Sequence, residues 1–68
     1  MIILEAIDNR TGIAVEIERP WFDHHDIYGA RTEAIRLFAY AGFLNFEKDS
    51  KGDLVASNSK FDVNITRV

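Results

Sequence analysis

The chain has 68 residues, of which 47% are hydrophobic, and it has no cysteine. A chain of this length forms one domain, and without cysteine it has no disulfides, thiolate metal ligands or thiol nucleophile. Eleven acidic residues against eight basic ones give a formal charge of −3, which disfavours nucleic-acid binding through a concentrated basic surface. We therefore expect residues 1–68 to form a single domain.

No apolar run approaches the ~20 residues that span a bilayer, and the chain starts without the basic leader of a signal peptide. Glu5 and Asp8 interrupt the apolar start. The apolar fraction is too high for a disordered chain. We expect a cytoplasmic protein.

Two runs rich in Ile and Val, 2–7 and 13–18, flank a polar stretch and predict a β-hairpin whose turn ends at Gly12. Pro20 removes a backbone donor and ends the second strand near Arg19.

The first strand of this hairpin is apolar on both faces. Ile2 and Ala6 belong to one face, and Ile3 and Ile7 flank Glu5 on the other. A strand with two apolar faces is typically covered on both. Since the chain has only one good helix, we expect a second protein surface to cover Ile3 and Ile7.

The second strand alternates between an apolar and an acidic face. We expect Ile13, Val15 and Ile17 on the core side, and Trp21 continues their phase and closes the core. Phe22 then faces the other way and is the exposed aromatic residue of a contact surface.

Glu16 and Glu18 occupy the outer face of the second strand. With Glu5 on the neighbouring strand they form an acidic patch that suits a basic partner. Paired carboxylates could also bind a cation or act as acid and base, but on an antiparallel sheet they are more often simply solvated.

Two adjacent histidines, His24 and His25, lie between Asp23 and Asp26. Histidines that bind one ion together on a helix are four residues apart, and no third ligand has a diagnostic spacing here. We therefore expect no metal or other cofactor, and a metal site at His24 and His25 is the weakest alternative. Asp23 or Asp26 is instead expected to cap the helix that follows, with the spacing of a capping box.

Residues 27–41 predict one amphipathic helix. Its apolar stripe consists of Ile27, Ala30, Ala34, Ile35, Phe38 and Ala41. Gly42 ends the helix, and Phe43 is expected to fold back against the last turn. Gly29 costs up to ~1 kcal/mol in a first turn, so either the helix begins after it or a neighbour packs closely there.

Residues 43–57 repeat the pattern of the first hairpin, with a polar turn at 49–52, and 61–68 alternate strictly after a weaker turn signal. We therefore predict an α+β fold of order ββαββ(β). Its antiparallel sheet has four to five strands, formed by two hairpins plus a C-terminal strand, and one helix packs on one face.

No motif indicates an enzyme, because no serine lies in a G-x-S-x-G setting and the isolated glycines form no phosphate loop. We expect a small non-catalytic protein-binding module, a dimeric regulator or inhibitor of the kind encoded by phages or mobile elements. The predicted interface residues are Ile3, Glu5, Ile7, Glu16, Glu18 and Phe22.

The alternative function is a nucleic-acid-binding regulator. In that case dimerisation gathers Arg31 and Arg36 of the helix, or Lys60 and Arg67 of the last strand, into one basic face.

Overall fold

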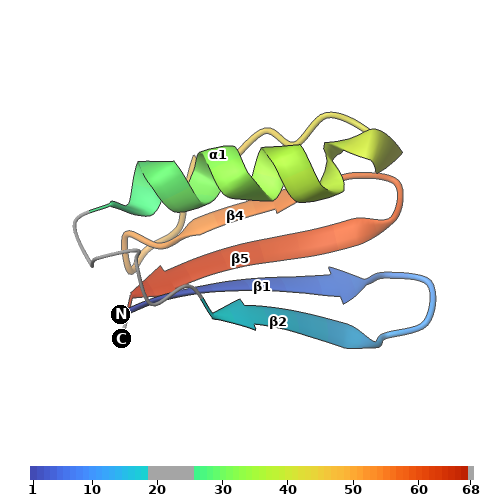
Figure 1. Cartoon of the computed structure of the whole chain (residues 1–68), viewed down its shortest axis with the longest axis horizontal. Coiled ribbons are helices and arrows are strands. Elements are labelled where there is room, and N and C mark those ends of the chain that lie inside the picture. Colours follow the sequence, from blue (N-terminus) through green and yellow to red (C-terminus); the bar gives the residue numbers. More distant parts are fainter. Residues whose placement is uncertain (19–25, 68) are drawn as a thin grey trace.

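The structure is a computed structural model that describes residues 1–18 and 26–67, with 16–18 as backbone only (Figure 1). The elements in chain order are β1 (Ile2–Asp8), β2 (Ala14–Glu18), α1 (Ile27–Phe38), the 3-10 helix η1 (Ala39–Ala41), β3 (Glu47–Lys48), β4 (Leu54–Ser57) and β5 (Phe61–Arg67). The predicted α+β class and the order ββαββ(β) are confirmed, and the fifth strand is a separate one.

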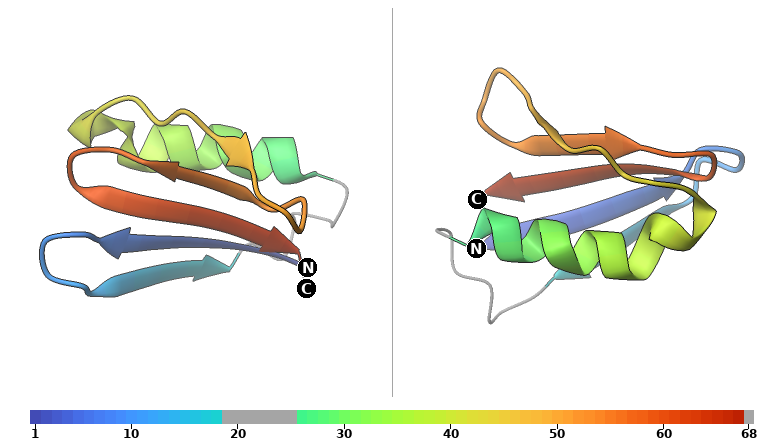
Figure 2. Two further views of the ribbon diagram at one scale, coloured as in Figure 1. Left: turned by 180° about the vertical axis from the view of Figure 1, so that it is seen from behind. Right: turned by 90° about the horizontal axis from the view of Figure 1, so that it is seen from above.

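The five strands form one antiparallel sheet in the order β2-β1-β5-β4-β3. The first and last strands therefore pair at its centre, and the marked chain ends lie next to each other (Figure 1). α1 connects β2 at one edge to β3 at the other and packs on one face of the sheet (Figure 2). In the part of the chain that the structure describes, no helix is long and apolar enough to cross a membrane.

The core lies between α1 and the central strands. Strand pairing places Leu4 opposite Ile65 and Ala6 opposite Val63, and all four side chains are buried. Paired residues share a face of the sheet, so the alternation in β1 and β5 brings one set of apolar side chains under the helix. The predicted stripe of α1 covers them with four buried side chains: Ile27, Ala30, Ala34 and Phe38.

Asp26 begins α1, as predicted for one of the two aspartates. Its Oδ1 accepts a hydrogen bond from the backbone N–H of Gly29 at 3.1 Å. A Cβ atom at position 29 would overlap this carboxylate. Glycine therefore stands in the first turn because the capping side chain occupies the space that any other residue would need.

Asn58 ties the end of α1 to the turn between β4 and β5. Its Nδ2 donates to the carbonyls of Phe38 at 3.0 Å and Gly42 at 2.9 Å. Its Oδ1 accepts from the backbone N–H groups of Lys60 at 3.0 Å and Phe61 at 2.9 Å. One amide thus satisfies four backbone groups at a helix end and a tight turn.

The prediction that Phe43 folds back on the helix is wrong, because its side chain is 78% exposed. The next residue, Leu44, takes the buried position instead and is 1% exposed. Residues 43–46 also form no strand, and β3 has only two residues. Neighbouring side chains in extended backbone point in opposite directions, so only one of this pair reaches the core.

The prediction that Ile13 and Val15 belong to the core is also wrong. Their side chains are 65% and 45% exposed, although the backbone of Val15 pairs with that of buried Ala6. α1 packs against β1 and β5 and leaves the edge strand β2 beyond its reach (Figure 1). Trp21, which was expected to close this part of the core, lies outside the described residues.

Candidate functional site

The face of the sheet opposite α1 is covered by no other described element, and we call it the open face (Figure 2, left). Ile3, Glu5 and Ile7 of β1 lie on it, and all three are half-buried. None of the three belongs to the core cluster. The structure therefore brings together the β1 residues that we predicted to lie at an interface.

Strands β4 and β5 complete the open face with mostly polar residues. The strand register places there Asp62, Asn64 and Thr66 of β5, and Val55 and Ser57 of β4. Ser57 donates a hydrogen bond from its Oγ to Oδ1 of Asp62 at 2.9 Å, and Thr66 donates to the carbonyl of Ile3 at 3.5 Å. The face is thus a mixture of apolar and polar groups that is typical of a contact surface.

Acidic residues dominate this face. Those with described side chains are Glu5, Glu47, Asp49, Asp53 and Asp62. The backbone of β2 adds two more acidic positions, because Glu16 pairs with Glu5 and Glu18 pairs with Ile3. Lys51 is the one basic side chain among the described residues of the face.

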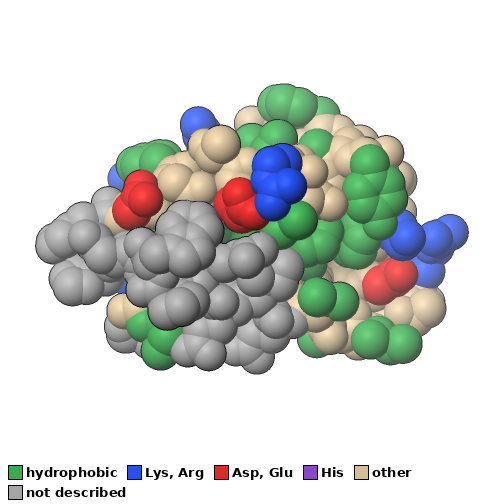
Figure 3. Space-filling view, viewed as in Figure 1, with side chains coloured by type: hydrophobic (Ala, Val, Ile, Leu, Met, Phe, Trp, Pro, Cys, Tyr) green, Lys and Arg blue, Asp and Glu red, His purple; other side chains and the backbone are tan. Residues whose placement is uncertain are grey.

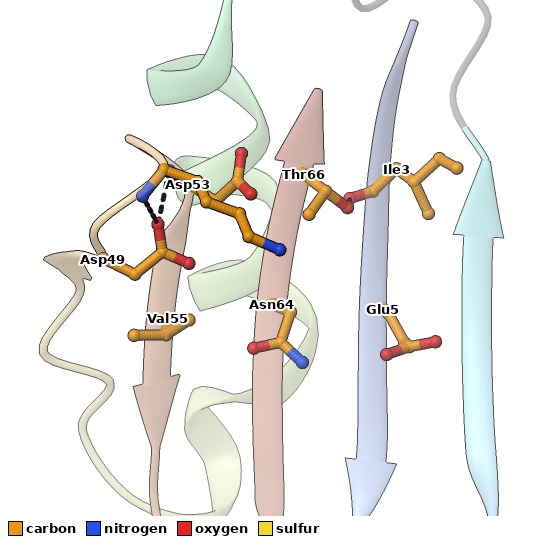
Figure 4. Close-up of a pocket in the computed structure, with 8 residues that line it drawn as sticks. Ile3, Glu5, Asp49, Asp53, Val55, Asn64 and Thr66 are labelled. Carbon is orange, nitrogen blue, oxygen red and sulfur yellow. Dashed lines mark hydrogen bonds between the residues drawn. The ribbon is translucent and has the colours of Figure 1, made fainter. Parts of the chain in front are cut away.

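A hollow of about 300 Å³ lies on the open face beside the turn between β3 and β4 (Figure 4). It is lined by Ile3, Glu5, Asp49, Lys51, Asp53, Val55, Asn64 and Thr66. Strands β1, β5 and β4 form its floor, and Glu5, Asn64 and Val55 lie across them in one row (Figure 4).

The turn that borders the hollow is organised by Asp49. Its Oδ1 accepts from the backbone N–H groups of Lys51 at 2.8 Å and Asp53 at 3.0 Å. Gly52 has a φ of 83°, which favours glycine, as predicted for the end of this turn. The backbone N–H of Arg67 reaches Oδ1 of Asp53 at 3.4 Å and holds the turn against the sheet.

Two polar side chains in the floor of the hollow have no partner among the described residues. Neither the carboxylate of Glu5 nor the amide of Asn64 forms a hydrogen bond or ion pair with another described residue, although both are half-buried. An amide offers two donors and an acceptor, and a carboxylate offers only acceptors. Both groups are therefore available to a bound molecule.

The helix arginines of the alternative function have partners on their own helix. Arg36 donates from Nε to Glu33 at 3.2 Å and also forms an ion pair with it. This hydrogen bond, and the charge of Glu33, raise the pKa of Arg36. The guanidinium of Arg31 lies 5.6 Å from the ring centroid of Tyr28.

The two basic residues at the ends of β5 lie far from each other. Lys60 precedes the strand, and its Nζ lies 5.5 Å from the ring centroid of Tyr40 and 5.4 Å from that of Phe61. Arg67 ends the strand, on the order of 20 Å away at about 3.3 Å per residue. Among the described residues in this view of the molecule, basic side chains are scattered and form no single patch (Figure 3).

Three of the predicted site residues, Phe22, His24 and His25, lie outside the described residues. Within residues 1–18 and 26–67, no group of three or more histidine, aspartate or glutamate residues is placed to hold a metal ion.

The sequence did not predict the residues of the hollow that come from segments distant from β1. They are Asp49, Lys51, Asp53, Val55, Asn64 and Thr66. Alternation along 61–67 already put Asn64 and Thr66 on one face, but nothing in the sequence indicated that this strand pairs with β1.

Searches against known proteins give no relatives: no protein-family model, no curated protein and no solved structure matches this chain.

Proposed function

We propose that this protein is a non-catalytic protein-binding module whose open face docks on a basic surface of a partner protein. The observation that carries the proposal is a sheet face on which no described element forms a second layer and where half-buried Ile3, Ile7 and Val55 lie among carboxylates. Covering these apolar groups favours association, because apolar area removed from water is stabilising.

Charge complementarity supports a basic protein surface as the partner. Carboxylates on three strands and a turn surround the apolar groups, and Lys51 alone opposes them among the described residues of the face. Such a surface attracts a positively charged one, accelerates its approach and rejects acidic surfaces. A basic patch on a protein is therefore the surface that this face fits.

A second copy of the chain fits the open face poorly. Two copies laid face to face would bring two acidic faces together, each with Glu5 and Asp62, and like charges in contact are unfavourable. The homodimer stays a prediction. Light scattering of the native protein tests it, and Ile3→Glu dissolves a dimer only if that dimer uses the open face.

A module of this size acts as a regulator or inhibitor by occupying the partner's basic surface. The role in a phage or mobile element and the cytoplasmic location are part of this proposal and rest on composition. Nucleic-acid binding would need an oligomer to gather cations that lie apart in one copy.

The test begins with affinity capture from the native host and continues with the purified partner. Two variants change the net charge by the same amount: Glu5→Gln on the open face and Thr32→Lys on the exposed side of α1. We expect the captured partner to have a basic surface. Its Kd should rise about tenfold with Glu5→Gln, because a buried charge pair is lost, and should be unchanged with Thr32→Lys. Equal Kd values for the two variants would overturn the proposal.

A further inference from the structure

The hollow on the open face points to the side chain that anchors the partner. We infer that it is a binding site for an arginine side chain, which inserts from the basic surface of the partner protein. This inference rests on the proposed function and assigns the central contact of the same face.

The size and walls of the hollow match one long side chain. Its volume of about 300 Å³ is at the lower end of the range for ligand pockets and leaves room for a single extended side chain. Ile3 and Val55 are its apolar residues and stand on strands on either side of β5 (Figure 4). An arginine carries a three-carbon stem that packs on apolar groups while its charged end reaches polar ones.

Several acceptor oxygens of the hollow remain available. Asp49 and Asp53 each use Oδ1 for backbone N–H groups, which leaves the second carboxylate oxygen of each without a hydrogen bond to a described residue. Glu5 contributes both oxygens, and Asn64 contributes its amide oxygen. These acceptors come from β1, β5 and the turn, and so they surround the hollow.

The spread of these oxygens selects a guanidinium over a compact ion. Among the described residues the carboxylates do not come close enough together to hold a metal ion. A guanidinium has five N–H donors in a rigid plane and binds several separated acceptors at once, whereas an ammonium group is a compact and strongly hydrated charge. Arginine therefore fits the hollow better than lysine.

Lys51 repels such a ligand electrostatically. It lines the hollow, and its ammonium group forms no ion pair with a described carboxylate. Its charge lowers the attraction for a second cation. The inference therefore predicts opposite signs for two substitutions, because removing Glu5 weakens binding and removing Lys51 strengthens it.

The experiment is an NMR titration of the full chain, followed by amide ¹H–¹⁵N spectra. The probe is N-acetyl-arginine methylamide, and the two comparison ligands are the lysine and citrulline amides. We expect the arginine amide to shift the signals of Ile3, Asp53 and Asn64 saturably, with a Kd in the millimolar range that suits a ligand of this size. Citrulline keeps the shape without the charge and is expected to leave these signals in place.

Three variants make the test specific. Glu5→Gln is expected to weaken arginine binding by about tenfold, which corresponds to about 1.4 kcal/mol. Glu47→Gln removes the same charge from the open face outside the hollow and is expected to change the Kd less than twofold. Lys51→Met is expected to tighten binding severalfold. The spectrum of each variant shows whether it is folded.

The result that overturns the inference is an arginine amide that leaves the hollow signals unmoved, or a lysine or citrulline amide that shifts them equally. These outcomes are separable from failure of the proposed function. If the Kd of the captured partner depends on Glu5 but the arginine amide does not bind, the docking on the open face is supported. The inference of an arginine site is then wrong. Arginine binding without any dependence of the partner on Glu5 shows that the hollow binds arginine and contradicts the proposed docking of the partner on the open face.

Discussion

The two faces of the sheet are built from alternate residues of the same strands, yet they have different roles. In β1, Leu4 faces α1 and is fully buried, whereas its neighbours Ile3 and Glu5 face away and are half-buried. The helix side is apolar and filled by the chain's own residues, and the open side is acidic and is covered by none of the elements that the structure describes. Substitutions on the first face should therefore act on stability, and substitutions on the second on binding.

Leu4→Ala should have the largest effect, because it removes a fully buried side chain from the centre of the core. We expect the free energy of unfolding to fall by about 2–5 kcal/mol. A domain of this length has a stability of only about 3–10 kcal/mol, so this loss is close to unfolding it. Urea denaturation followed by circular dichroism measures the change, and a loss below 1 kcal/mol would contradict the assigned core (by the same cavity reasoning).

Asn58→Ala should have the second largest effect. It removes two hydrogen bonds that join the end of α1 to the β4–β5 turn and two more within that turn, and we expect a loss of about 2–4 kcal/mol. Asn58→Asp is the matched control, since it keeps the two acceptor bonds and loses the two donor bonds. Its carboxylate also faces the carbonyl oxygens of Phe38 and Gly42, so its loss in thermal melts should be at least half that of Asn58→Ala, and a smaller loss would rule out the donor bonds as main contributors.

Asp26 and Gly29 should be coupled. Asp26→Ala removes the cap and should cost about 1 kcal/mol. Gly29→Ala alone should be close to neutral, because the gain in helix propensity is offset by displacement of the capping carboxylate. With Ala at position 26, the same change should stabilise by about 1 kcal/mol. A double-mutant cycle with additive effects would show that the two side chains do not compete for space.

Ile3→Thr should have the smallest effect on stability, about 0.5 kcal/mol or less, because it keeps a β-branched residue at a half-buried position on the open face. The same change should weaken partner binding, since it replaces an apolar wall of the hollow with a hydroxyl group. Denaturation and a binding titration of one protein preparation compare the two effects. A large loss of stability would place Ile3 in the core and remove the distinction between the faces.

Much of the fold was predictable because local patterns specify it. Runs rich in Ile and Val located β1 and β2, alternation located β5, and the three- and four-residue spacing located α1. The helix cap at Asp26 and the turn ending at Gly52 also followed from local chemistry.

The candidate site was only partly predictable, because it depends on strand order. Glu5 and Ile3 were identified from β1 alone, but Asp53 and Asn64 join them only because β5 pairs with β1 and β4 with β5. Such pairing connects residues about sixty positions apart, and alternation within one strand contains no information on it. The misplacement of Val15 has the same origin, since the pattern of an edge strand does not show how far the helix extends.

The pairing of the first strand with the last one has a mechanical consequence. Ile2 lies opposite Arg67, so a force that pulls the two ends apart loads this outermost pair first. The hydrogen bonds of an antiparallel ladder loaded in this way open one after another instead of sharing the load. The sheet should therefore unzip along its middle into a two-stranded and a three-stranded half, and in single-molecule stretching it should yield at low force.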